Sequence, residues 1–247
     1  MSLKIGLKLA KNYSVNFSLP KREKHKIKFI IIHYTGMKKE SKAIKRLCDE
    51  KSKVSSHYFI QNNGKILNLV PDLYEAWHAG ISNWKGVKSL NQYSVGIEIN
   101  NPGHNNNYKK FSERQISSLL RLLRYLKKKY QINKKNILGH SDIAPNRKKD
   151  PGEKFPWKIL AKKQLCHWHN LNETKLERFR NIKLSISEQK IFIKNLYNIG
   201  YVKITRLNIN RVEKYLIEAF QRKFRQALVN GKIDKECFLI AKDLVKS

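Results

Sequence analysis

FIIIHYTG, residues 29–36, joins an apolar run to a polar end. Its three isoleucines are β-branched and do not alternate with polar residues, which is typical of a central strand buried on both faces. His33 follows the isoleucines, so its imidazole is expected at the end of this strand. Because α/β proteins bind their ligands beyond the ends of such strands, His33 is a candidate functional residue.

A helix and a hairpin are predicted directly after this strand. Residues 41–50 carry apolar residues at helical spacing. Residues 57–70 predict two strands around Asn63-Gly64, the dipeptide that a type I′ hairpin turn prefers. We therefore expect an antiparallel pair next to the buried strand.

A second strand places a carboxylate in the sheet. Val95, Ile97 and Ile99 alternate with smaller or polar residues, so their side chains share one face of the strand. Glu98 lies between two of them and is expected to point from the opposite face. An outward-facing surface position is the alternative for this residue when the strand is considered alone.

The longest helical pattern covers residues 112–130. Ser112 and Gln115 are placed as a capping box at its start, and apolar residues keep the helical period to its end. A short strand over residues 136–139 follows and leads into His140. Strands mixed with helices predict an α/β domain, with a central mixed β-sheet flanked by helices.

The C-terminal part of the chain is predicted to be helical, with helices at 187–199, 209–229 and 234–245. We therefore expect a small three-helix domain after the α/β domain. The predicted organisation is an N-terminal extension (1–26), the α/β domain (27–160), a connector (161–184) and the helical domain (185–247).

The composition is that of a folded chain with a strong positive charge. The 247 residues are 40% hydrophobic, and 52 Lys and Arg against 19 Asp and Glu leave a formal charge of +33. This charge favours polyanionic partners such as nucleic acid, anionic membranes or cell-wall polymers, although an A/T-rich coding genome would also enrich Lys, Asn and Ile. No transmembrane segment is expected, and residues 1–20 show no secretory signal.

Two histidines and one aspartate form a candidate metal site. His33 and His140 both end predicted strands, and the loop after His140 can fold back to bring Asp150 to the same point. Two imidazoles and one carboxylate bind Zn²⁺ in catalytic sites and leave a fourth position open for water. Spacing alone leaves open the alternative that each histidine is an ordinary buried or surface residue.

Four blocks of sequence between residues 27 and 160 resemble the zinc-dependent N-acetylmuramoyl-L-alanine amidases of the amidase-2 family. They are FIIIHYTG, VSSHYFIQNNGKILNLVPDLYEAWHAG, LNQYSVGIEINNPG and LGHSDIAPNRKKDPGEKFPW. That family shares its fold with the peptidoglycan recognition proteins. The resemblance implies an enzyme that hydrolyses the amide bond between the lactyl group of N-acetylmuramic acid and L-alanine. It also implies one Zn²⁺ per chain, held by His33, His140 and Asp150.

The resemblance implies roles for four further residues. Glu98 matches the general base of the family, and Lys148 matches the lysine that can stabilise a developing oxyanion. Trp77 and His78 match a loop that borders the groove, and both are expected to bind substrate, with a structural role as the alternative for His78.

The helical tail is similar to the three-helix peptidoglycan-binding module that follows this catalytic domain in some cell-wall amidases. Peptidoglycan or soluble muropeptides are therefore the expected partners. An extracytoplasmic location is favoured, with a cytosolic recycling role as the alternative. Two other functions are alternatives: a non-catalytic peptidoglycan-recognition protein, and a basic nucleic-acid-binding protein suggested by the charge alone. The full ligand set favours the enzyme, and no nucleic-acid-binding motif supports a specific nucleic-acid partner.

Overall fold

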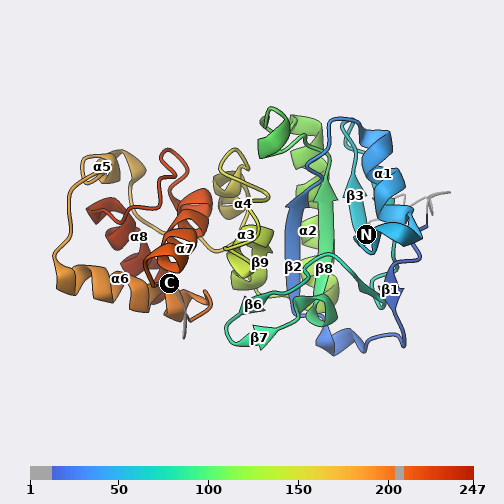
Figure 1. The fold of residues 1–247 in the computed structure, drawn as a ribbon, viewed down its shortest axis with the longest axis horizontal. Helices are drawn as coiled ribbons and strands as arrows, with labels where there is room; N and C mark the ends of the chain where they lie inside the picture. Colours follow the sequence, from blue (N-terminus) through green and yellow to red (C-terminus); the bar gives the residue numbers. More distant parts are fainter. Residues whose placement is uncertain (1–12, 204–208) are drawn as a thin grey trace.

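The computed structural model describes residues 13–203 and 209–247 of the chain. A central sheet contains β2 (Phe29–Tyr34), β3 (Tyr58–Ile60), β4 (Ile66–Asn68), β8 (Ser94–Ile99) and β9 (Ile137–Gly139). Its five strands lie in the order β4-β3-β8-β2-β9. All neighbours pair in parallel except β4, which runs antiparallel to β3 at one edge. Figure 1 shows helices on either side of this mixed sheet, and the predicted fold class is confirmed.

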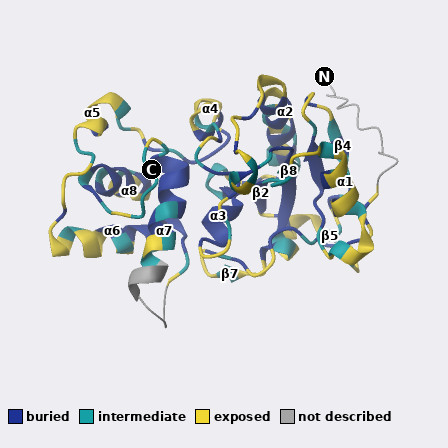
Figure 2. Ribbon diagram, turned by 45° about the horizontal axis from the view of Figure 1, so that its top comes forward, coloured by how far each residue is buried: buried dark blue, intermediate teal, exposed yellow. Residues whose placement is uncertain are grey.

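The β2 strand lies at the centre of the molecule because both of its faces are apolar. Ile30 and Ile32 pack on one side against the long helix α2 (Glu113–Tyr130). Phe29 and Ile31 belong to a second cluster on the opposite side of the sheet. Figure 2 shows β2 and β8 buried between their neighbours. The strand therefore holds its last residue but one, His33, in a fixed place.

The predicted helix over residues 112–130 is confirmed, together with its cap. Ser112 is the N-cap of α2, and both hydrogen bonds of the capping box with Gln115 are present. The three lysines at its end occupy the last turn, where positive charge interacts favourably with the helix dipole. A shorter helix, α1 (Glu40–Cys48), matches the helix predicted over residues 41–50.

The predicted hairpin is confirmed, but the type I′ turn is wrong. Such a turn needs a positive φ at both central residues. Of Asn63 and Gly64, only Gly64 has a positive φ, of 84°. The Gly64 amide donates to the Gln61 carbonyl at 2.9 Å, which places the turn one residue earlier. The hairpin tip lies against α2, where a Cβ on Gly64 would come within 2.7 Å of the Arg114 carbonyl oxygen.

The described part of the predicted N-terminal extension, residues 13–26, packs against the α/β domain. The strand β1 (Phe17–Ser18) pairs with β5 (Glu75–Ala76) in a separate two-stranded sheet. Arg22 is buried, and its guanidinium donates to the carbonyl oxygens of Asn91 and Ser94. Residues 1–12 of the extension lie outside the described residues. A further hairpin consists of β6 (Asn83–Trp84) and β7 (Val87–Lys88).

The helices of the C-terminal part are α5 (Glu173–Glu177), α6 (Ile186–Ile199), α7 (Ile209–Phe224) and α8 (Lys235–Lys246). They contain the three predicted helices, although α7 ends at Phe224 rather than at residue 229. The Gln221 side chain accepts hydrogen bonds from the amides of Asn230 and Gly231, so the chain turns back before Leu228 can continue the helix. The predicted connector contains α5, which follows α4 (Trp157–Lys162).

The C-terminal helices share a hydrophobic cluster with the sheet, and Figure 1 shows them on the β9 side of the molecule. A buried ion pair joins the two parts: Lys223 Nζ of α7 lies 3.0 Å from Asp142 Oδ2. The hydroxyl of Tyr201 donates to the other oxygen of Asp142 at 2.9 Å. None of the helices in the described ranges is both long and apolar enough to cross a membrane.

Candidate metal centre and active site

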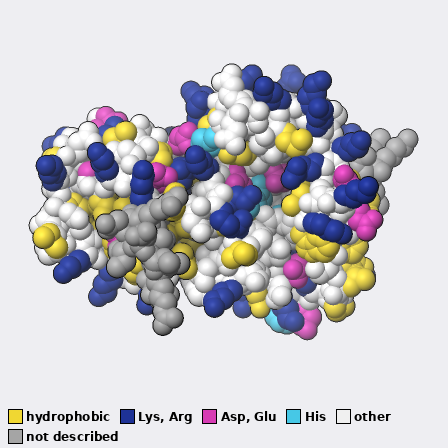
Figure 3. Space-filling view, in the orientation of Figure 1, with side chains coloured by type: hydrophobic (Ala, Val, Ile, Leu, Met, Phe, Trp, Pro, Cys, Tyr) yellow, Lys and Arg dark blue, Asp and Glu magenta, His cyan; other side chains and the backbone are white. Residues whose placement is uncertain are grey.

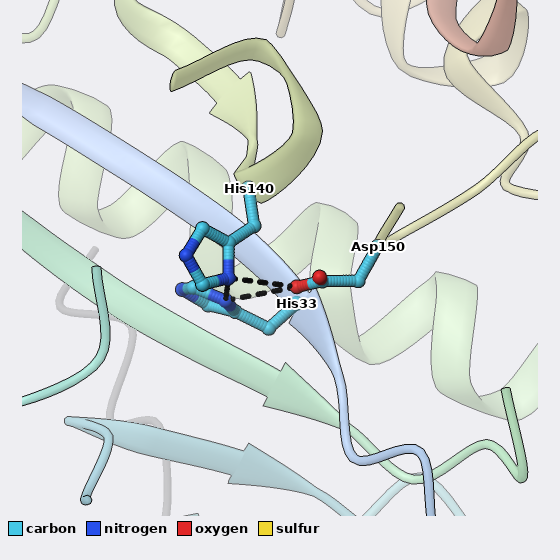
Figure 4. A group of neighbouring side chains, drawn as sticks. All are labelled: His33, His140 and Asp150. Atoms are coloured by element: carbon cyan, nitrogen blue, oxygen red, sulfur yellow. Dashed lines mark hydrogen bonds and ion pairs between the residues drawn. The ribbon is translucent and has the colours of Figure 1, made fainter. Parts of the chain in front are cut away.

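The structure brings together the three predicted metal ligands. The Nδ1 atoms of His33 and His140 lie 2.9 Å apart, and each is 3.1 Å from Oδ2 of Asp150. All three side chains are buried. Figure 4 shows these atoms turned toward a common point.

The topology of the sheet explains why residues far apart in sequence meet here. Ile32 of β2 is the register partner of Gly139 of β9, so the two parallel strands end at the same edge. His33 follows Ile32, and His140 follows Gly139 as the first residue of the short helix α3 (His140–Ile143). Asp150 returns to this edge because its carbonyl oxygen accepts the Ser141 amide at 2.8 Å.

The charge state of the cluster suits a divalent cation. Burial and the neighbouring His140 lower the pKa of His33 to about 4, so its imidazole is neutral at pH 7. Burial raises the pKa of Asp150, but the imidazoles of His140 and His33 outweigh it and hold this pKa well below its usual range. Two imidazole nitrogens and one carboxylate oxygen are a donor set that binds zinc. Donor atoms on a tetrahedral zinc are about 3.3 Å apart, close to the spacing found here.

Glu98 lies beside this cluster on β8. One of its carboxylate oxygens, Oε2, is buried and has no hydrogen-bond partner among the described residues. Burial, followed by the charge of Asp150, raises the pKa of Glu98 to about 8, while Lys148 opposes the shift. A carboxylate with a buried, uncommitted oxygen is a suitable acceptor and donor of protons.

A pocket of about 620 Å³ opens over these residues. Its walls include Trp77, His78 and Lys148 as well as the cluster and Glu98. Arg46 and Arg147 also line it, which makes its wall strongly basic. Figure 3 shows histidine and acidic side chains in a central hollow of this face, with Lys and Arg around it. The pocket therefore suits a ligand that carries carboxylates.

The two residues predicted to bind substrate differ in their surroundings. Trp77 is half-buried, and its indole N–H donates to Ser18 Oγ at 2.8 Å. His78 is buried, and its ring nitrogens lie 3.0 Å from His33 Nε2 and 3.1 Å from Ser94 Oγ. The predicted substrate contact of His78 stays a prediction.

Several residues around the site carried no signal in the sequence. Arg46 belongs to the polar face of α1 and looks like an ordinary solvated residue. Arg147 donates to the carbonyl oxygens of Ala79 and Ile81, and Asn91 binds backbone amides of the 78–79 segment. These side chains bind backbone groups that are far away in the sequence. No periodic pattern or motif in the sequence predicts such contacts.

Comparisons with known proteins identify the family. The sequence profile described as N-acetylmuramoyl-L-alanine amidase matches residues 23–153. The N-acetylmuramoyl-L-alanine amidase AmiD of Escherichia coli (strain K12) is 34% identical over 233 residues, which cover 90% of this chain and 83% of AmiD.

Two solved structures support the same conclusion. The complex of AmiD from E. coli with the substrate anhydro-N-acetylmuramic acid-L-Ala-D-gamma-Glu-L-Lys matches with a TM-score of 0.78 at 32% identity, covering 97% of this chain and 92% of that chain. AmpDh3 from Pseudomonas aeruginosa in complex with anhydromuramic pentapeptide matches with a TM-score of 0.79 at 27% identity. The match covers 97% of this chain and 98% of that chain.

The mixed sheet, with its polar pocket at the strand ends, has the fold and site of an amidase that acts on peptidoglycan. The chain belongs to the N-acetylmuramoyl-L-alanine amidase family. Its predicted enzymatic function is thereby confirmed, in preference to the recognition-protein and nucleic-acid-binding alternatives.

Proposed function

We propose that the chain cleaves the amide bond between the lactyl group of N-acetylmuramic acid and L-alanine with one Zn²⁺ held by His33, His140 and Asp150. The observation that carries this proposal is the convergence of two Nδ1 atoms and one carboxylate oxygen within 2.9 to 3.1 Å of one another, beside Glu98. When bound, Zn²⁺ supplies Lewis acidity and lowers the pKa of water.

Glu98 is proposed as the general base. Its uncommitted Oε2 can accept a proton from the attacking water and later deliver it to the nitrogen of the leaving alanine. Burial raises the pKa of this carboxyl to about 8, and a dication nearby would oppose that effect by stabilising the ionised form.

Lys148 is proposed to stabilise the oxyanion that develops on the scissile carbonyl. It lies in the wall of the pocket, two residues before Asp150. An ammonium group aimed at the developing charge would lower the barrier to hydrolysis. Its neighbour Lys149 also lines the pocket, which makes the pair a useful comparison.

The proposed substrate is a muropeptide. We expect the enzyme to accept muropeptides whose muramic acid is in the 1,6-anhydro form. Support comes from the two solved relatives, whose complexes contain anhydromuramic peptides. The basic wall of the pocket suits the carboxylates of a stem peptide, and the Trp77 ring offers an apolar face to a sugar or a peptide methyl group.

We infer an extracytoplasmic site of action, with residues 185–247 as a wall-binding module. The charge of +33 favours retention on anionic wall polymers, and this retention should weaken as salt is added. Cytosolic recycling of soluble fragments is the alternative. A mass-spectrometric product map from intact sacculi and from soluble muropeptides, run side by side, distinguishes the two.

The same product map tests the proposed reaction. We expect one zinc per purified chain and release of free stem peptides that begin with L-alanine. His33→Ala should abolish both zinc binding and cleavage. Zinc binding and muropeptide binding without cleavage by the unmutated protein would instead support a recognition protein.

A further inference from the structure

Two consecutive residues, His78 and Ala79, contact both proposed metal-ligating imidazoles on the side away from the metal. His33 Nε2 lies 3.0 Å from Nδ1 of His78, and His140 Nε2 lies 3.1 Å from the carbonyl oxygen of Ala79. We propose that the 78–79 segment orients both imidazoles for metal binding, and that His78 is a positioning residue rather than a substrate ligand. This inference rests on the proposed function of His33 and His140 as zinc ligands.

The hydrogen bonds around His78 allow one consistent placement of protons. A nitrogen that ligates a metal carries no proton, so neutral His33 must be protonated at Nε2 and donate to Nδ1 of His78. His78 is then protonated at Nε2 and donates to Ser94 Oγ, 3.1 Å away. The Ser94 hydroxyl in turn donates to the Leu90 carbonyl at 2.6 Å. This chain of donors fixes the His33 tautomer that exposes Nδ1 to the metal.

The β8 strand is shaped to hold the His78 ring. Ser94, Gly96 and Glu98 alternate along β8 and share the face opposite α2. A Cβ on Gly96 would come within 2.4 Å of Cγ of His78, so only glycine leaves room for the ring. One face of the strand thus provides a hydrogen bond to His78, a space for its ring and the carboxylate proposed as the base.

The backbone of the segment is also held in place. Oδ1 of Asn91 accepts the amides of His78 at 3.1 Å and Ala79 at 2.7 Å. The Arg147 guanidinium donates to the same Ala79 carbonyl that faces His140, at 3.2 Å. Fixing this carbonyl fixes the acceptor for His140 Nε2, which leaves Nδ1 of His140 for the metal.

Both ring nitrogens of His78 are therefore engaged by the protein. Its side chain lies edge to face with the rings of His33 and His57. A substrate group could reach a His78 nitrogen only by displacing His33 or Ser94. These contacts support a role for His78 in orienting His33.

The test compares zinc affinity in His78 variants. His78→Leu removes the acceptor for His33, and we expect a loss of about 10- to 100-fold in affinity, measured by competition with a chelator. His78→Asn keeps an acceptor at the position of Nδ1, so its affinity should lie nearer the wild type. The absorption spectrum of the Co²⁺-substituted protein should change in His78→Leu and be restored in His78→Asn. His167→Leu is the matched control, because His167 is buried and contacts Ser247 in the C-terminal part.

A folded His78→Leu protein with wild-type zinc affinity and cobalt spectrum would overturn the inference. If His78→Leu does not fold, the ¹⁵N chemical shifts of His33 and His78 in the zinc-loaded wild type decide. Protonation of both rings at Nε2 supports the inference, and protonation of either ring at Nδ1 contradicts it. A wild-type protein that binds no zinc would count against the proposed function itself, which is a separate outcome.

Discussion

His33 and Glu98 are register partners on the adjacent parallel strands β2 and β8. Paired residues on neighbouring strands point to the same face of the sheet. The imidazole proposed to bind zinc and the carboxylate proposed as the base are therefore held together by backbone hydrogen bonds of the central sheet rather than by a loop. A site built on rigid strands keeps its geometry while substrates enter and leave.

Glu98→Gln tests the role of the base, because it keeps the shape of the side chain but cannot accept the proton as a carboxylate does. We expect kcat for muropeptide cleavage to fall by about 10²- to 10⁴-fold. Zinc content should remain at the wild-type value, since Glu98 is outside the ligand set. Cleavage at an unchanged rate, with zinc bound, would exclude Glu98 as the base.

Lys148→Met tests stabilisation of the oxyanion, and Lys149→Met is its matched control. Both lysines line the pocket, so the two variants lose the same charge from the same wall. If Lys148 acts on the transition state, its replacement should lower kcat by about 10²- to 10³-fold with little change in KM. Lys149→Met should affect mainly KM. Equal losses in kcat would mean that the lysines contribute only a general positive potential.

Much of the site could be predicted from sequence because its residues lie at the ends of strongly patterned strands. The apolar run before His33 and the alternation around Glu98 are local signals, and the structure places both strands as predicted. Parallel pairing then brings the strand ends to one edge without any further information. The convergence of His33 and His140 follows from this topology.

The supporting residues could not be predicted, because their contacts are not periodic. Asn91 holds the 78–79 backbone from a short 3₁₀ helix (Leu90–Tyr93), and Arg22 reaches the sheet from the predicted N-terminal extension. The glycine at position 96 lies on the other face of the strand from the alternating apolar residues, and the reason for a glycine there appears only when the His78 ring is seen against it. Such residues are specified by the folded neighbourhood rather than by their own stretch of sequence.

Lys223→Met tests whether the C-terminal helices stabilise the catalytic part. The side chains of Lys223 and Asp142 are only 3% and 1% exposed, and Asp142 also accepts the Gly139 amide just before His140. Removing the lysine leaves a buried carboxylate without its charge partner. We expect the free energy of unfolding to fall by about 3–5 kcal/mol in urea denaturation.

Lys158→Met is the control for that measurement. Lys158 pairs with Glu173, but the two side chains are 50% and 40% exposed. Breaking an exposed pair should change the free energy of unfolding by only about 0–1 kcal/mol. Similar small effects in both variants would show that the C-terminal helices do not depend on the Lys223–Asp142 pair for their attachment.

Asp72 should make the stability of the protein depend on pH in the acid range. Its buried carboxylate accepts hydrogen bonds from Tyr58 at 2.6 Å, from Tyr130 at 2.7 Å and from Lys129 at 2.8 Å. Burial raises the pKa of Asp72, but these hydrogen bonds outweigh it, and the pKa lies below its ordinary value. A lowered pKa means that the folded protein binds fewer protons than the unfolded chain near the ordinary carboxyl pKa of about 3.9. The contribution of Asp72 is therefore present above that pH and is lost as the pH falls through its folded-state pKa.

The measurement is the free energy of unfolding in urea from about pH 7 down to about pH 3, compared between the wild type and Asp72→Asn. The variant should be less stable at neutral pH, because an amide interacts more weakly with the Lys129 ammonium. The difference between the two proteins should shrink as the wild-type carboxylate becomes protonated. Glu50→Gln, at an exposed position of the same domain, should leave the wild-type pH profile unchanged. A constant difference across the whole range would show that ionisation of Asp72 does not contribute to stability.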